Sequence, residues 1–216
     1  MSIAQSHEGY IPAAGHHWSL PLYDPLTALI GVDRVRRALL EHAGLSVPQR
    51  VLDIGCGTGT LAVLIKRTHP RVEVTGIDPD PKALARARRK AERAGASIRL
   101  DTGMADALPY PDAAFDRVCS SFMFHHLRGD EKSDMLREVR RVLAPGGRLE
   151  LVDFAGPEAQ GGFLKRLLHA HELLKDNAEN RVLTRMRDAG LLEPRCIGRR
   201  SLVVGEVNYY QASRAN

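Results

Sequence analysis

The stretch Val51-Leu52-Asp53-Ile54-Gly55-Cys56-Gly57-Thr58-Gly59-Thr60 carries the strongest structural signal in the chain. A short aliphatic run leads directly into a turn with three glycines, and the helical pattern LAVLIKRTH follows. Glycine permits backbone angles that other residues avoid and lets a ligand approach the main chain, while a helix N-terminus presents unpaired N–H groups. The stretch therefore predicts a ligand-binding turn between a buried strand and a helix.

Around this turn, short apolar runs alternate with amphipathic stretches. Gly95 marks the end of one expected helix, and the run from Ala144 to Gly147 is expected to break another before the next strand. Alternating strands and helices build parallel βαβ units, so we predict an α/β fold with a doubly wound, mostly parallel, Rossmann-like sheet. The expected strands are 51–54, 72–78, 97–101, 115–121 and 148–154, and the expected helices are 34–43, 60–69, 81–94 and 130–143.

All 216 residues are assigned to a single domain, which suits this length. We divide it into an N-terminal helical arm and cap (1–45), a ligand-binding core (46–154) and a helical segment with closing strands (155–216). The last part is expected to hold two helices over 161–190 and strands over 193–200 and 205–212, which give the sheet a C-terminal antiparallel strand. The arm holds Tyr23 and the only tryptophan, and we expect it either to cover the ligand or to pack against the sheet edge.

The composition excludes several classes of protein. With 31 Lys and Arg against 26 Asp and Glu the net charge is +5, and 44% hydrophobic residues are typical of a globular domain. We find no membrane-spanning run, no signal-peptide pattern and no paired cysteines, which favours a cytoplasmic protein. Nucleic acid is not expected, because no aromatic stripe accompanies the basic residues of 82–93. No metal site is expected either, because adjacent histidines point apart.

Three classes of nucleotide ligand can be compared at the glycine turn. A phosphate-binding loop would need a lysine, and none lies between Gly55 and Leu64. A dinucleotide fingerprint would need glycine where the chain has Thr60, so an NAD-dependent oxidoreductase is disfavoured. A cationic ligand suits the turn better, because Asp53 can accept a hydrogen bond from an ammonium group. S-adenosylmethionine is such a ligand.

Asp78 ends the second expected strand, about twenty residues after the turn, where a carboxylate can bind both hydroxyls of a ribose. Its neighbour Pro79 would line the adenine side. Asp80 is expected to cap the next helix, with Pro81 in the first turn. Because Asp78 is not needed for the cap, we predict that it binds the ribose.

Five motifs together resemble those of class I S-adenosylmethionine-dependent methyltransferases, particularly the branch of ubiquinone and menaquinone C-methyltransferases. They cover about residues 45–154 and follow the family's order. The motifs are VLDIGCGTGT (51–60), VTGIDPD (74–80), ALPYPDAAFDRV (107–118), SSFMFHHL (120–127) and LREVRRVLAPGGRLELVDF (136–154).

The resemblance implies S-adenosyl-L-methionine as cofactor and assigns roles to several residues. Asp53 and the turn from Gly55 to Gly59 would surround the methionine part, and Asp78 would bind the ribose. Either Ser120 or Ser121 would lie near the cofactor, and we take Ser120. The expected cofactor contacts are Asp53, Gly55, Cys56, Gly57, Asp78, Pro79, Met104, Ala105, Ser120 and, from the arm, Tyr23.

The chain departs from the family pattern at Met104. This residue stands where an aspartate of the family commonly receives the amino group of adenine. Methionine is polarisable and can lie against a purine ring, and the backbone of Met104 and Ala105 could meet the adenine edge. Asp106 could replace the missing acid only after a local shift.

Methyl transfer from a sulfonium is an in-line displacement, for which positioning and exclusion of water can suffice. Where the acceptor needs a base, His125 and His126 after the fourth expected strand are the candidates, because an imidazole titrates near neutral pH. We favour His125. Its alternative roles are to cap the loop or to pack. The amphipathic segment 163–175 is expected to be an ordinary helix packed on the sheet. It also suits a lid, a dimer contact or, less favoured, a membrane contact. We predict a methyltransferase for a small apolar or aromatic acceptor. The alternative is a non-catalytic S-adenosylmethionine-binding or regulatory module.

Overall fold

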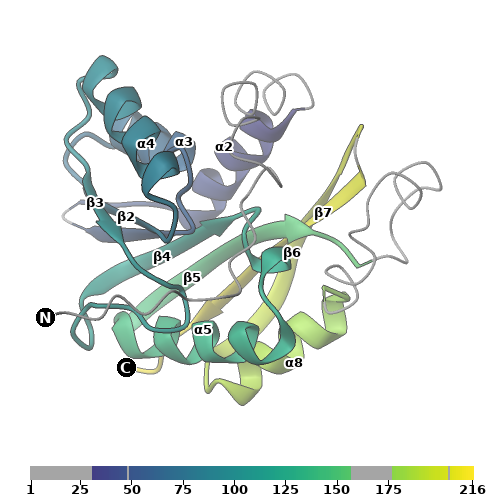
Figure 1. The fold of residues 1–216 in the computed structure, drawn as a ribbon. Coiled ribbons are helices and arrows are strands. Elements are labelled where there is room, and N and C mark those ends of the chain that lie inside the picture. The colour runs from purple at the N-terminus through teal and green to yellow at the C-terminus, as the bar shows by residue number, and fades with distance from the viewer. Residues whose placement is uncertain (1–30, 48, 157–176, 204) are drawn as a thin grey trace, which may run out of the picture.

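The computed structural model describes residues 31–47, 49–156, 177–203 and 205–216 (Figure 1). These residues form one seven-stranded sheet with five α-helices and a single 3-10 turn. The strands are β1 (Arg50–Ile54), β2 (Glu73–Asp78), β3 (Arg99–Thr102), β4 (Phe115–Ser121), β5 (Leu143–Phe154), β6 (Leu192–Leu202) and β7 (Gly205–Ser213). The helices are α2 (Val32–Ala43), α3 (Thr60–Thr68), α4 (Pro81–Arg93), α5 (Gly129–Val142) and α8 (Glu179–Asp188), and the 3-10 turn is η1 (Phe124–His126).

The strands lie in the order β3-β2-β1-β4-β5-β7-β6. β1 to β5 pair in parallel, whereas β7 runs antiparallel to both of its neighbours, β5 and β6. The chain order reverses between β1 and β4, which is the switch point where open α/β sheets bind ligands. The predicted α/β sheet, mostly parallel with a C-terminal antiparallel strand, is confirmed.

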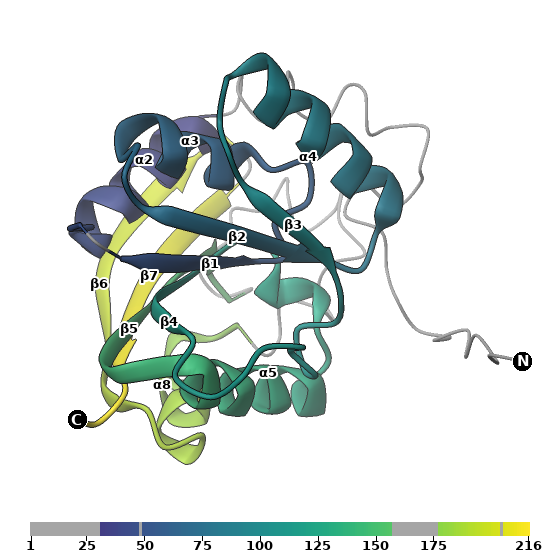
Figure 2. The same ribbon diagram turned by 90° about the vertical axis from the view of Figure 1, so that its left-hand side faces the viewer.

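Helices cover both faces of the sheet. In Figure 2, α2, α3 and α4 lie above the strands, while α5 and α8 lie below them. Each face has its own apolar core: Val35, Leu39 and Ile65 belong to the upper one, and Met135 and Leu136 to the lower one. Burial of these aliphatic side chains is the main source of stability for both layers.

The expected elements that fall within the described residues agree with the structure to within three residues, with one exception; of the two helices expected over 161–190, the described residues show α8. The run Ala144–Gly147 was expected to be a break, but it lies inside β5 as an irregularity. Leu143 already pairs with Phe115, and regular pairing with β4 resumes only at Arg148. The proline and two glycines therefore form a bulge within the strand.

The arm with Tyr23 and the amphipathic segment 163–175 lie outside the described residues, so the roles expected for them stay predictions. Within the described part of the chain, no helix is both long and apolar enough to cross a bilayer.

Candidate functional site

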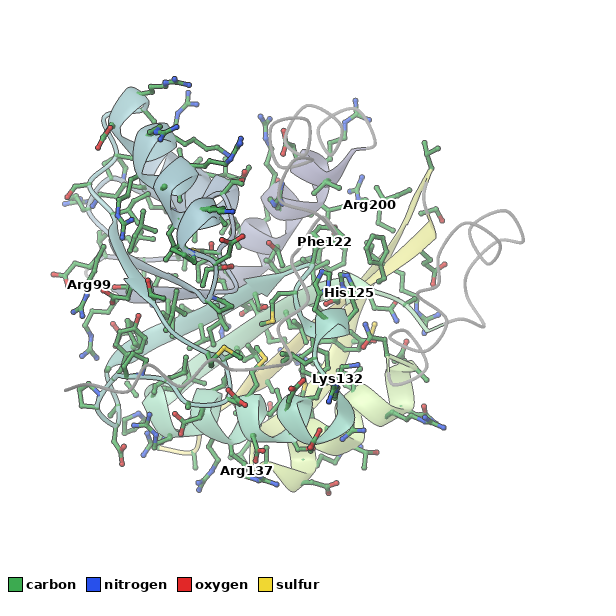
Figure 3. All side chains as sticks on the ribbon, viewed as in Figure 1. Arg99, Phe122, His125, Lys132, Arg137 and Arg200 are labelled. Carbon is green, nitrogen blue, oxygen red and sulfur yellow. The ribbon has the colours of Figure 1, made fainter. Side chains whose placement is uncertain are left out.

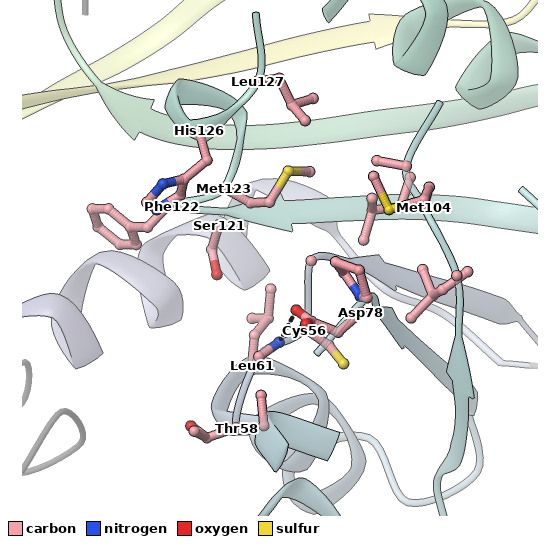
Figure 4. Close-up of a pocket in the computed structure, with 18 of the residues that line it drawn as sticks. Cys56, Thr58, Leu61, Asp78, Met104, Ser121, Phe122, Met123, His126 and Leu127 are labelled. Carbon is pink, nitrogen blue, oxygen red and sulfur yellow. Dashed lines mark hydrogen bonds between the residues drawn. The ribbon is translucent and has the colours of Figure 1, made fainter. Parts of the chain in front are cut away.

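A pocket opens at the carboxyl ends of the parallel strands. Its walls come from the turns after β1, β2, β3 and β4, together with α2 and α5. In Figure 4, Asp78, Leu61 and Thr58 lie on one side of this space, while Met123 and His126 lie on the other. Including its open mouth and the solvent space there, the pocket measures about 1070 Å³. Seven of the predicted cofactor contacts line it: Gly55, Cys56, Gly57, Asp78, Pro79, Met104 and Ala105.

The glycine turn has a backbone conformation in which residues other than glycine would be strained. Gly55 and Gly57 have φ angles of 66° and 53°, in the left-handed region. The N–H of Gly55 donates to the carbonyl of Ile77 at 2.9 Å, which fixes the turn to β2. A Cβ on Gly55 would overlap the Met123 side chain, whereas a Cβ on Gly57 would meet nothing within 4 Å. The main chain is thus open to a ligand beside Gly57.

Cys56 within the turn is a packing residue. Its side chain is 8% exposed, and its Sγ would lie 2.9 Å from a Cβ built on Gly76 of β2. Burial raises the pKa of the Cys56 thiol far above its ordinary value. A thiol that stays protonated is a poor nucleophile, so Cys56 shapes the pocket wall and has no covalent role.

Asp78 is held at the end of β2, facing the glycine turn. Its Oδ2 accepts a hydrogen bond from the N–H of Gly57 at 2.8 Å, and its Oδ1 accepts one from the N–H of Asp80 at 2.9 Å. Burial raises the pKa of the Asp78 carboxyl, and these two hydrogen bonds partly offset the rise. Each carboxylate oxygen can accept a further bond, so the side chain can still bind two hydroxyls. Asp80 caps α4 as predicted, by accepting from the N–H of Lys82.

Asp53 is the next-to-last residue of β1 and is only 1% exposed, and it does not itself line the pocket. Burial raises the pKa of its carboxyl to about 7, although the charge of Arg36 acts in the opposite direction. Among the described residues, neither oxygen of Asp53 makes a well-formed hydrogen bond. The backbone N–H of Ala62 interacts with the carboxylate only weakly. A cation bound in the pocket, on the other side of the glycine turn, would favour the charged form of this carboxylate.

Arg36 of α2 lines the pocket and was not predicted as a site residue. It is 6% exposed, its Nη1 lies 3.4 Å from Oδ1 of Asp33, and its guanidinium lies 5.9 Å from the ring centre of Phe122. With Asp53 behind the turn, this wall holds both a positive and a negative group. An amino acid zwitterion would find complementary charges there.

The two serines at the end of β4 point in different directions. Ser120 is fully buried, and its Oγ donates to the carbonyl of Ile54 at 3.2 Å. Ser121 lines the pocket instead, because successive side chains of a strand point to opposite faces. The next residue, Phe122, also lines the pocket and has a positive φ of 56°. Such a backbone is strained for a bulky residue, and strained residues cluster at functional sites.

His125 and His126 follow in η1 and have different surroundings. Figure 3 marks His125 in the segment after β4. Its Nδ1 lies 2.6 Å from Oδ1 of the buried Asp153, but His125 is not part of the pocket lining. His126 does line the pocket, and its ring centre lies 4.1 Å from that of His125. Burial, with the neighbouring His125, lowers the pKa of His126 to about 4, so its imidazole is neutral at physiological pH.

Sequence reasoning missed two charged residues of the pocket wall, Arg36 and Glu131, and it favoured His125 over His126, which is the histidine that lines the pocket. Arg36 and Glu131 come from helices far from the glycine turn in sequence, and no local pattern marks them. Of the residues it did predict, Asp53, Ser120 and His125 lie outside the lining. Within the described ranges, no three potential metal ligands come together.

A sequence model described as a methyltransferase domain matches residues 51–147. A demethylmenaquinone methyltransferase of Thermus thermophilus is 45% identical over 146 residues, which cover 66% of this chain and 65% of the relative. An enzyme of the same name from Deinococcus radiodurans is 44% identical over 158 residues, covering 71% of this chain and 64% of that protein. The chain thus spans slightly less than two thirds of these curated relatives.

Among solved structures, the YcgJ protein of Bacillus subtilis superimposes with a TM-score of 0.72 at 20% sequence identity. The match covers 85% of this chain and 99% of that protein. At this identity the likeness establishes the fold alone.

Proposed function

We infer that the chain belongs to the class I S-adenosylmethionine-dependent methyltransferase family, and we propose that it methylates a ring carbon of a small quinone-type acceptor. The observation that carries the proposal is the combination of the free space beside Gly57 and the carboxylate of Asp78 in the pocket wall, with the unsatisfied carboxylate of Asp53 buried behind the glycine turn. The names of the two relatives support the quinone-type acceptor.

The residues of the pocket fit S-adenosyl-L-methionine. In our proposal Asp78 binds the ribose hydroxyls, Asp53 attracts the ammonium group through the glycine turn, and Arg36 faces the carboxylate of the methionine part. When bound, the donor supplies a methyl group on a positively charged sulfur, which takes the bonding electrons as the methyl group leaves. Asp53 and Asp78 therefore act by binding and orientation.

An aromatic cluster beside the pocket supports a flat acceptor. Phe122 meets Phe154 edge-on with ring centres 5.3 Å apart, and His125 meets Phe154 in the same manner, also at 5.3 Å. Aromatic rings prefer such geometry, and each ring adds apolar area. A hydroxylated ring could pack against this cluster while its reactive carbon faces the pocket.

His125 is the proposed base for this reaction. Transfer of a methyl group to a ring carbon replaces a hydrogen, so a proton must be removed from the ring or from its hydroxyl. Because Nδ1 of His125 donates to Asp153, Nε2 is the nitrogen that can take this proton. The buried carboxylate of Asp153 would then stabilise the charged imidazole.

The three free cysteines support our further proposal that the protein works in the reducing cytoplasm.

The alternative proposal is a module that binds S-adenosylmethionine without transferring its methyl group, and Met104 is the observation that favours it. Methyl incorporation decides between the two. Purified protein would be incubated with isotopically labelled S-adenosylmethionine and, separately, a short-chain demethylnaphthoquinol, a phenol, an amine and a thiol, with product analysis by mass spectrometry. We expect a methyl group on the naphthoquinol ring carbon. Donor binding without product in any reaction would favour the binding module.

A further inference from the structure

The walls of the donor pocket lack a carboxylate where the family motif would place one. Met104 and Ala105 of the turn after β3 both line the pocket. Asp106, the nearest acidic residue in sequence, does not. The 6-amino group of an adenine in this part of the pocket would therefore find a thioether beside it, and a buried amino group without an acceptor is costly.

The pocket does hold a second carboxylate, on a different element. Of the described residues that line it, only Asp78 and Glu131 are acidic. Asp78 lies at the end of β2, and Glu131 lies in the first turn of α5. Figure 4 shows Leu127, four residues before Glu131, on the wall opposite Asp78. The two carboxylates thus belong to different walls, and one ligand could reach both.

Glu131 has hydrogen-bonding capacity to spare. Its Oε2 accepts from the N–H of Arg128 at 2.7 Å, which is the reciprocal bond of a capping box. Among the described residues, no bond to its other oxygen, Oε1, is found. The cap holds the side chain in place, and the positive end of the α5 dipole favours its charge. One oxygen is therefore fixed and the other is available to a ligand.

We propose that Glu131 accepts a hydrogen bond from the 6-amino group of the donor's adenine, in place of the acid that Met104 replaces. The adenine ring would lie among the apolar side chains of Met104, Ala105 and Leu127, with its amino edge toward α5. This inference rests on the proposed function, since it assumes that the pocket binds S-adenosylmethionine. It makes Glu131 the residue that distinguishes a 6-amino purine from a 6-oxo purine.

The test is the ratio of two dissociation constants measured by calorimetry, one for S-adenosylhomocysteine and one for S-inosylhomocysteine. The two ligands differ at the 6-position, where inosine presents an oxygen that Glu131 would repel. In the wild-type protein we expect the adenosyl ligand to bind about tenfold more tightly or better, as a charged hydrogen bond implies. In Glu131→Ala the ratio should fall to near 1.

Two further variants keep the test specific. Asp130→Ala removes the neighbouring acid of the same helical turn, which does not line the pocket, and it should leave the ratio unchanged. Met104→Asp in the Glu131→Ala background should restore discrimination by returning an acid to the family position. If Glu131 only capped α5, its replacement would weaken the binding of both ligands equally.

The possible failures can be told apart. If the wild-type protein binds neither ligand, the proposed function fails together with this inference. If it binds S-adenosylhomocysteine but Glu131→Ala keeps the wild-type ratio, the inference alone is overturned. Equal binding of both ligands to the wild-type protein would overturn it as well.

Discussion

Nδ1 of His125 lies 2.6 Å from Oδ1 of Asp153, and the backbone N–H of His125 donates to Oδ2 of the same carboxylate at 3.0 Å. Burial raises the pKa of the Asp153 carboxyl, but its electrostatic interaction and hydrogen bonds with His125 lower the pKa more, so it stays below its ordinary value. Asp153 is therefore an anion that holds both the ring and the main chain of His125. This fixes the tautomer and the direction of Nε2.

The first prediction concerns His125→Ala. If Nε2 takes the proton of the acceptor, kcat should fall by about 10²–10³-fold. The dissociation constant for S-adenosylhomocysteine should change by less than about twofold, because His125 does not line the donor pocket. Steady-state kinetics with the naphthoquinol and calorimetry with the product analogue measure the two quantities.

His69→Ala is the matched control, since His69 directly follows α3 and does not line the donor pocket. It should keep wild-type kcat. Asp153→Asn should lower kcat while leaving the KM for the donor unchanged, because Asp153 orients His125 and does not line the donor pocket. An unaltered kcat in His125→Ala would remove His125 from the mechanism and point to its pocket-lining neighbour, His126.

The second prediction concerns the buried Asp53 carboxyl. Its pKa is about 7 in the folded protein and ordinarily 3.8, so between these values the folded protein binds more protons than the unfolded chain. The free energy of unfolding contributed by Asp53 is therefore highest at low pH and falls as the pH rises toward 7. Asp53→Asn should raise the free energy of unfolding at pH 8 by about 1–3 kcal/mol, and thermal denaturation measures it.

The same substitution should weaken donor binding, because the amide cannot attract an ammonium group. We expect the affinity of the wild-type protein for S-adenosylhomocysteine to decline as the pH falls below 7, and that of Asp53→Asn to lose this dependence. Asp112→Asn, whose side chain is 73% exposed, is the control. A variant that is less stable than wild type at pH 8 yet binds normally would contradict this role of Asp53.

The third prediction compares two glycines of one turn. Both have positive φ angles, so alanine is strained at either position by about 1 kcal/mol. Gly55→Ala also collides with Met123 and should be the more destabilised variant in thermal denaturation. Gly57→Ala meets open space, so it should fold but bind S-adenosylhomocysteine at least about tenfold more weakly, because its methyl group occupies the ligand's path.

The Met123 contact can be checked separately. The double variant Gly55→Ala with Met123→Ala should recover part of the lost stability, because the collision is relieved while the backbone strain remains. Equal stability of the two single glycine variants, or wild-type affinity in Gly57→Ala, would contradict the geometry of the turn.

Much of the fold could be predicted because its signals are local. Each signal occupies only a few consecutive residues: the aliphatic run before the glycine turn, the carboxylate at Asp78 and the cap at Asp80. The bulge in β5 could not be predicted, because it depends on the pairing of Leu143 with Phe115 across the sheet. Proline and glycine occur both in loops and in bulges, so their presence does not distinguish the two structures.

The site residues were harder to predict where their role depends on the direction in which a side chain points. Ser120 and Ser121 are adjacent, and the register of β4 with β1 decides which of them reaches the pocket. Likewise, nothing local says that His126 faces the pocket while His125 binds Asp153. Arg36 reaches the pocket from a helix that precedes β1, and only the packed sheet brings it there.

The most direct measurement of the central claim is a calorimetric titration of S-adenosylhomocysteine into the wild-type protein and Asp78→Asn, with Asp112→Asn as control. We predict saturable binding to the wild type and to the control. Asp78→Asn should bind at least about tenfold more weakly, because an amide cannot accept from both ribose hydroxyls. No heat and no thermal stabilisation of the wild type at millimolar ligand, or unchanged affinity in Asp78→Asn, would contradict the account.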